Sequence, residues 1–283
     1  MGYTEVPNSV RTILILLTTL SFLPQLHRLR SRKCSLGLSP SYVLCNLIFA
    51  TEQLTNIFYM MVNYPEARWD DFVHDPVTAG DWLNFAQMAI TWGLFLVLFI
   101  LTIHYRPPQR RKCEYVNLYT FYLCISLIPE VIDIVDLTPV LSTPSWSTDH
   151  LVGAFVSMHG LLLNTLAPFF SLISILPQTA QIWKHIRKKE YDCLSLLGLA
   201  VQAVVFAFVA ASWPWRISYT DVDYGKFAPG WFWESGWPVV ENGVFAGVQG
   251  VLLLVAVWRR LVQRREGGKR DEEREREPLL QSR

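Results

Sequence analysis

Charged residues are scarce in this sequence. Asp, Glu, Lys and Arg make up 17% of its 283 residues, against roughly 25% in an ordinary soluble domain. They are also clustered, because nine of the 25 bases and six of the 24 acids follow Trp258. Apolar residues account for 51% of the chain. This composition excludes a disordered chain, and the missing basic face excludes a nucleic-acid binder.

Cysteine is scarce as well. The five cysteines show no spacing typical of a metal site, and we expect no lumenal disulfide. No Asn-x-Ser/Thr sequon is present to mark an extracellular segment. The sequence therefore predicts neither a disulfide scaffold, nor a metal site, nor a cofactor.

Long apolar runs are what the sequence has in abundance. A helix crosses a bilayer with about 20 mostly apolar residues, in a range of about 17 to 25. Seven stretches qualify, and the acidic flank of the first argues against a cleavable signal peptide. They are residues 10–26, 42–63, 82–103, 115–137, 151–177, 193–213 and 237–258. The sequence predicts an all-α integral membrane protein with seven transmembrane helices.

The basic residues predict how these helices are oriented. Three alternate loops contain twelve bases, whereas the other three contain only Arg68, Arg216 and Lys226. The twelve are Arg28, Arg30, Arg32, Lys33, Arg106, Arg110, Arg111, Lys112, Lys184, Arg187, Lys188 and Lys189. Because basic loops stay in the cytosol, we expect a lumenal N-terminus over residues 1–9 and a cytosolic C-terminus.

An internal repeat links the first and fifth spans. Pro24-Gln25 and Pro177-Gln178 each lie at the expected cytosolic end of a span, 153 residues apart, and each precedes a basic loop. The same direction of crossing predicts two parallel three-helix repeats, residues 10–104 and 151–258, joined by a linker helix over 115–137 (3+1+3). Proline bends a helix, so we interpret Pro24, Gln25, Pro177 and Gln178 as hinges.

These motifs resemble a known family. Pro24-Gln25 with Gly37-Leu38-Ser39, and Pro177-Gln178 with Leu194-Ser195, are similar to the PQ-loop repeat family, which includes cystinosin, the lysosomal cationic amino acid exporters, the KDEL receptors and, more distantly, the SWEET sugar transporters. The sequence as a whole most resembles fungal-type members of this family. The resemblance implies the fold and a membrane function, but no particular substrate.

The same resemblance exposes one departure. In cystinosin-like members, an acidic residue seven positions after the serine of the loop motif is tied to proton coupling. Here Gln202 follows Ser195 by seven residues, and Asn46 follows Ser39 by seven. Neither residue titrates, so coupling of that kind, and cystine as the substrate, are not implied.

Ionisable residues inside spans are the remaining candidates for function, because each costs about 2.5–3.5 kcal/mol to insert. The predicted substrate and proton-coupling residues are Glu52, Asn56, Glu130, Asp133, Asn164, Gln202, Glu241 and Asn46. Asp136 is assigned to the headgroup region instead. His159, alone in the fifth span, is assigned to packing.

The charged C-terminal segment, residues 259–283, is predicted to be a disordered cytosolic tail. It contains Glu275 four residues before Leu279-Leu280, a pattern similar to the acidic dileucine signals that clathrin adaptors read. The sequence thus predicts a sorting signal, with an adaptor as a partner besides the lipid bilayer.

Taken together, these features favour a proton-coupled secondary transporter of a small polar solute, with an amino acid as first choice, in a vacuolar or lysosomal membrane. Its partners would be the solute and protons. The alternative is a non-transporting receptor or chaperone of the secretory pathway with the same fold. A signalling receptor lacks support from the internal repeat, and a membrane enzyme has only the Glu130–Asp133 pair in its favour, so we expect no enzyme.

Overall fold

The structure is a computed structural model that describes residues 5–62, 72–74, 76–106, 112–136, 156–185, 193–217, 231–232 and 236–281. Within these ranges the side chains of residues 128–136, 156, 185, 264 and 266–281 are not described. The described residues form helices and no strand, which confirms the all-helical class.

The N-terminal half contains four long helices. They are α1 (Asn8–Arg32), α2 (Pro40–Val62), α4 (Ala79–His104) and α5 (Lys112–Asp136). A capping box begins α4, because the Thr78 side chain accepts a hydrogen bond from the Asp81 backbone and the Asp81 side chain accepts one from Thr78. Pro24 lies inside α1, and the helix continues beyond it to Arg32.

The C-terminal half is more broken. A π-helix, η1 (Val156–Leu163), runs into α7 (Asn164–Ile173) and α8 (Ile175–His185). Ser174 alone separates α7 from α8, and its backbone stays close to helical values, so the bend before Pro177 is small. After these come α9 (Leu196–Ser212), the short 3-10 helix η2 (Trp213–Trp215) and α10 (Trp237–Gln281).

Several helices are long and apolar enough to cross a membrane. Within the described ranges there are five: Asn8–Arg32, Ala79–His104, Ser157–Lys184, Leu196–Trp215 and Trp237–Gln263. The predicted second and fourth spans also form helices, α2 and α5, but they are not among these five. In α2 the polar residues Glu52, Gln53 and Asn56 follow one another closely and lower its hydropathy. The chain is therefore a multi-pass helical membrane protein.

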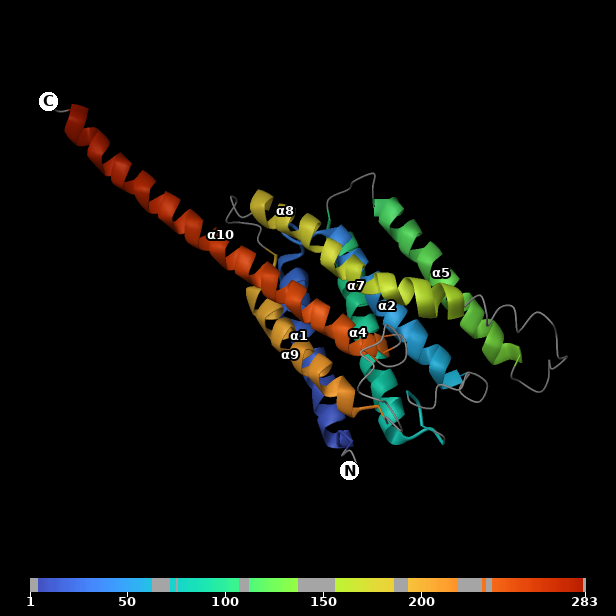
Figure 1. Ribbon diagram of the computed structural model, residues 1–283. Helices are drawn as coiled ribbons and strands as arrows, with labels where there is room; N and C mark the ends of the chain where they lie inside the picture. The colour runs from blue at the N-terminus through green and yellow to red at the C-terminus, as the bar shows by residue number, and fades with distance from the viewer. Residues whose placement is uncertain are drawn as a thin grey trace.

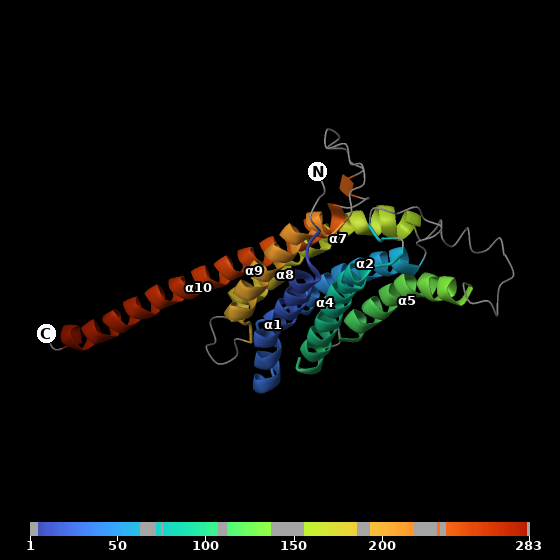
Figure 2. The same cartoon turned by 90° about the horizontal axis from the view of Figure 1, so that it is seen from below.

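The helices pack as two similar three-helix units. In the first unit, α1 and α2 both pack on α4, and in the second unit, α9 and the α7–α8 pair both pack on α10. The units meet along two seams, one where α1 contacts α9 and one where α2 contacts α7 and α8. The remaining helix, α5, packs on α2 at the edge of the bundle (Figure 1 and Figure 2).

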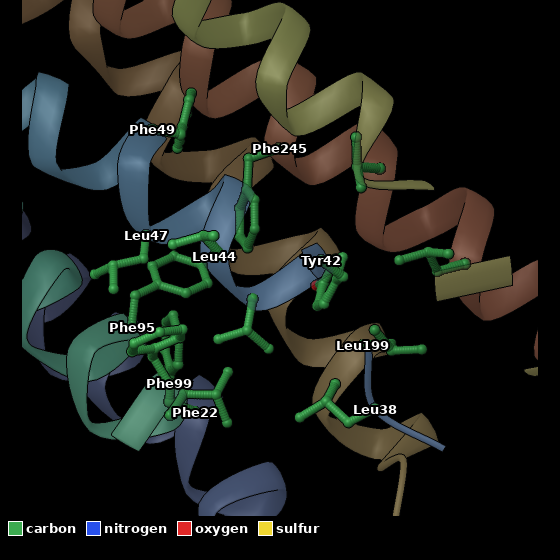
Figure 3. Close-up of a cluster of buried hydrophobic side chains, with 14 of the residues drawn as sticks. Phe22, Leu38, Tyr42, Leu44, Leu47, Phe49, Phe95, Phe99, Leu199 and Phe245 are labelled. Atoms are coloured by element: carbon green, nitrogen blue, oxygen red, sulfur yellow. The ribbon is translucent and has the colours of Figure 1, made fainter. Parts of the chain in front are cut away.

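Phenylalanines fill the space between the two units. Phe22 of α1 and Phe95 of α4 lie edge to face with ring centroids 4.9 Å apart, as Figure 3 shows. Phe245 of α10 packs on Phe95 at 5.4 Å and on Phe206 of α9 at 4.6 Å. Each ring comes from a different helix, so these contacts join the units by close side-chain packing, which drives helix association in a bilayer.

The C-terminal segment differs from its predicted disorder. Helix α10 continues past the last apolar residues to Gln281 and extends well beyond the bundle (Figure 1). Opposite charges at helical spacing, such as Lys269 with Glu273 and Glu272 with Arg276, favour a helix there. Glu275, Leu279 and Leu280 lie on this helix, with side chains outside the described residues.

Candidate functional site

Glu52 is the centre of the most polar region inside the helix bundle. It lies on α2, is 1% exposed, and accepts three side-chain interactions. The Tyr122 hydroxyl of α5 donates to Oε2 at 2.6 Å, and Asn56 Nδ2, one turn along α2, donates to Oε1 at 3.4 Å. His159 Nδ1 approaches both carboxylate oxygens, at 3.0 and 3.2 Å. These contacts give both oxygens of the buried carboxylate a polar partner, as buried polar groups require.

His159 therefore contacts Glu52, and the assignment of this residue to packing alone is wrong. The side chain is fully buried and belongs to η1. A π-helical stretch is uncommon and occurs often at functional sites, because its wider turn redirects side chains. The sequence signal was the single histidine in an apolar span, but its facing partner lies 107 residues away and could not be read from spacing.

A second buried carboxylate, Glu241 of α10, faces this cluster. Its side chain is completely buried, and neither oxygen has a hydrogen-bond partner of good geometry among the residues that the structure describes. Gln53 of α2 approaches it, and the Glu52 carboxylate is close enough for their charges to interact. A buried charge without donors is costly, so a proton or a cationic group of a ligand would relieve that cost at Glu241.

The other predicted polar residues are distributed along the seam between α2 and α7–α8. Asn46 is buried and bonded to Tyr42 O at 2.8 Å, to Ser174 Oγ at 3.2 Å and by Ser171 Oγ at 3.1 Å. It thus joins the two units rather than lining open space. Asn164 is 2% exposed, and its Oδ1 has no partner among the described residues.

Three further predicted residues differ in what the structure says of them. Gln202 is buried on α9, which lies on the other seam. Glu130 and Asp133 are on α5, but their side chains lie outside the described residues, so their part in the predicted site is not tested.

The two Pro-Gln pairs form a reciprocal arrangement that we call the glutamine clasp. Gln25 Nε2 of α1 donates to Cys193 O at 2.9 Å, and Ser195 N donates to Gln25 Oε1 at 2.8 Å. Gln178 Nε2 of α8 donates to Gly37 O, and Ser39 N donates to Gln178 Oε1, both at 2.8 Å. Each glutamine therefore binds the loop of the opposite unit, and together they close both seams at one end.

The loops that receive these glutamines have matching local structures. Ser39 caps α2 by accepting a hydrogen bond from Tyr42 N at 3.5 Å, and Ser195 caps α9 by accepting one from Gly198 N at 3.1 Å. Gly37 has a φ of 92°, which a side chain would strain. Each repeat thus contains both parts of the pairing: a glutamine that binds the loop of the opposite unit, and a loop with a serine that receives the opposite glutamine.

The fold and the buried polar groups define an all-helical, multi-pass membrane protein in which two three-helix units enclose a glutamate–histidine cluster. The family model of the PQ loop repeat matches residues 8–67, which include α1, α2 and the loop between them. Over these residues the chain is similar to the PQ loop repeat, as its motifs predicted. No significant match was found among curated proteins or among solved structures.

Proposed function

We propose that this protein is a proton-coupled secondary transporter of a small polar solute, with an amino acid as the first candidate. The proposal includes seven spans in a 3+1+3 arrangement, a lumenal N-terminus and a cytosolic C-terminus. It also includes a vacuolar or lysosomal membrane, supported by the dileucine pattern at Glu275, Leu279 and Leu280. The PQ-loop repeat family includes membrane transporters, which agrees with this function.

One observation carries the proposal, namely the buried cluster of Glu52, His159 and Glu241. Two carboxylates and an imidazole buried near one another can take up or release protons. Among the described residues, Glu52 has hydrogen-bond partners, whereas Glu241 has none. A proton that enters the cluster, or leaves it to one side of the membrane, would change the charge of the cluster.

The packing of the two units supplies the conformational part of the proposal. Helix α2 meets the second unit through the Asn46 contacts near the end of α7 and through the Glu52–His159 contact with η1. Helix α10, which carries Glu241, also packs on α7. A change of charge in the cluster therefore acts directly across the unit boundary. In alternating access, one repeat moves against the other around a central site.

Flux into liposomes tests the proposal. Purified protein would be assayed with labelled cationic and neutral amino acids, cystine and hexoses, with and without an imposed pH gradient. We expect at least one amino acid to follow the gradient. In Glu52→Gln and Glu241→Gln we expect that dependence to be lost, because neither amide exchanges a proton.

Glu114→Gln is the matched control, because Glu114 is an exposed acid near the start of α5. It should transport like the wild type. Gradient-dependent flux that is unchanged in both Glu52→Gln and Glu241→Gln would refute the role of the cluster. Absence of flux for every solute, with folded protein, would refute the transporter itself.

A further inference from the structure

Two arginines are buried together at the opposite end of the α1–α9 seam from the glutamine clasp. Arg11 of α1 is 1% exposed and Arg216, which follows η2, is fully buried. Arg11 Nη2 lies 3.4 Å from the Arg216 backbone oxygen. Arg11 precedes Gln25 by fourteen residues, or about 21 Å at 1.5 Å per residue. The arginine pair is therefore separated from the clasp by about that distance along α1.

Among the described residues, little negative charge surrounds the two arginines. Arg11 is 3.7 Å from Glu5, whose side chain is 53% exposed, and Asp81 contributes from further away. Arg216 forms no ion pair with any described residue, and its charged neighbour is Arg11. Burial, and secondarily the charge of Arg11, lower the pKa of Arg216 to about 9.

Several guanidinium donors also lack acceptors. Arg11 Nη1, Arg216 Nε and Arg216 Nη2 are buried and have no hydrogen-bond partner in the described structure. Leaving such donors unsatisfied next to a like charge is costly. A carboxylate removes both costs at once, because its two oxygens accept parallel hydrogen bonds from guanidinium groups.

Neighbouring side chains hold the Arg216 guanidinium in place, and a glycine leaves space for that of Arg11. The Arg216 guanidinium carbon lies 5.0 Å from the centre of the Trp213 ring, and Arg216 Nη1 contacts Asn84 Oδ1 at 3.4 Å. On α4, Gly80 presents no side chain, and a Cβ there would lie 2.4 Å from Arg11 Nη1. The glycine is thus needed for Arg11 to occupy its present position.

We propose that Arg11 and Arg216 bind the carboxylate group of a small organic solute. This deepens the transporter proposal and rests on it for the solute's transport, although binding itself is independent of flux. The charges on the two seams are opposite to those of a zwitterion. The α1–α9 seam carries buried guanidinium groups that suit a carboxylate, and the other seam carries Glu52, which suits an ammonium group. Asn164, which corresponds to Arg11 in the second repeat, places no charge on that seam.

A stack of aromatic rings connects the arginines to the helix of Glu241. Trp213 lies beneath Arg216 and stacks on Phe72 at 5.9 Å, and Phe72 stacks on Trp237 at 5.4 Å. Trp237 is one turn before Glu241 on α10. A ligand that draws the arginines together thus acts on side chains packed against the helix that carries the second carboxylate.

Binding to purified, detergent-solubilised full-length protein tests the site. The probes are sodium acetate, L-alanine, L-alaninamide and a short peptide with a free carboxylate, compared with sodium chloride at equal ionic strength. We expect acetate and L-alanine to raise the melting temperature in a saturable way, and L-alaninamide and chloride not to do so. In Arg216→Gln and Arg11→Gln the apparent Kd should rise at least tenfold.

Gly80→Ala tests the same site without removing a charge, because its methyl group displaces the Arg11 guanidinium. It should also weaken acetate binding, which provides an answer if an arginine variant fails to fold. Gly93→Ala, on the same helix with open space around it, and Arg30→Gln, an exposed arginine of α1, should bind as the wild type does.

The outcomes separate the two proposals. Unchanged acetate binding in Arg216→Gln and Gly80→Ala would overturn the carboxylate site, as would equal effects of chloride and acetate, or binding of the peptide alone. Acetate binding that these variants remove, without flux of any solute, would leave the site standing and refute the transporter. Flux together with unchanged binding in the variants would refute the site alone.

Discussion

The Tyr122 hydroxyl makes the shortest hydrogen bond to Glu52, at 2.6 Å, and it comes from the helix outside both three-helix units. A hydrogen bond to a charged group contributes about 1.5–3 kcal/mol. Replacing Tyr122 by Phe removes this donor and keeps the ring. We therefore expect Tyr122→Phe to lower gradient-driven flux by about ten- to a hundredfold, because the Glu52 carboxylate loses its shortest hydrogen bond.

The control for this variant is Tyr115→Phe, on the same helix as Tyr122. It removes a hydroxyl that lies 3.1 Å from Ser41 Oγ of α2, away from the carboxylates. Its flux should stay at the wild-type level. Gradient-driven flux of Tyr122→Phe equal to that of the wild type would contradict the role of this hydroxyl.

His74 makes a second pH-dependent contact, outside the membrane spans. Its Nδ1 lies 3.0 Å from Asp81, and its Nε2 lies 3.3 Å from Glu5. Burial lowers the pKa of His74, but the hydrogen bond and charge of Asp81, followed by those of Glu5, outweigh it and raise the pKa above its usual 6.5. Protonated His74 thus ties the N-terminal segment to the start of α4.

Because the folded-state pKa is the higher one, this stabilisation is complete below about pH 6.5 and is lost as pH rises through the folded-state value. We expect His74→Gln to lower the melting temperature at pH 5.5 and to have little effect at pH 8.5. Melting curves across that range provide the measurement. An equal loss at both pH values would show that the histidine acts through packing and not through its charge.

At the scale of elements, the glutamine clasp determines how two loops and two helix ends meet. Gln25→Ala would leave Cys193 O and Ser195 N without their partners, and Gln178→Ala would do the same to Gly37 O and Ser39 N. Each loss should cost about 2 to 5 kcal/mol in free energy of unfolding, because buried backbone groups remain unsatisfied.

Thermal unfolding in detergent would measure both variants, and the matching geometry predicts nearly equal effects. Gln181→Ala, three residues further along α8 and only partly buried, should stay close to the wild type. A stable Gln25→Ala protein would mean that water or neighbouring side chains replace the clasp.

The clasp also shows what could be predicted for these elements. The repeated Pro-Gln and Ser motifs predicted two related units, and the PQ loop repeat matches residues 8–67, which lie largely in the first of them. They were interpreted as hinges, however, because a sequence shows which residues recur and not which ones meet. Gln25 and Ser195 are 170 residues apart, so their pairing follows only from the packing of α1 against α9.

At the scale of the whole molecule, the orientation in the membrane remains a prediction of the basic loops. Cys113 is exposed in the first turn of α5, at the end that we place in the cytosol. A membrane-impermeant maleimide should label it only when it has access to the cytosolic face. Sealed vesicles of both orientations, with Cys113→Ser to identify the labelled site, provide the test. Labelling of Cys113 from the lumenal face would invert the topology.

The packing of several helices around Glu52 explains which residues of the site could not be predicted from the sequence. Glu52 was found because an acid inside an apolar helix is conspicuous in a sequence, and its neighbour Asn56 followed from helical spacing. His159 and Tyr122 meet Glu52 from two other helices, and no local pattern gives such a meeting. Arg216 was counted only as a loop base and Arg11 was not singled out, whereas packing buries both.

The α1–α9 seam has unlike ends. The clasp of Gln25 holds one end with two hydrogen bonds, and at the other end the buried charges of Arg11 and Arg216 repel each other. Repulsion between charges weakens as ionic strength rises, although burial limits the screening. The spacing of the helices at the arginine end should therefore vary with the salt around the protein while the clasped end stays fixed. Because the two ends differ in this way, the salt around the protein should change the arginine end even when no solute is transported.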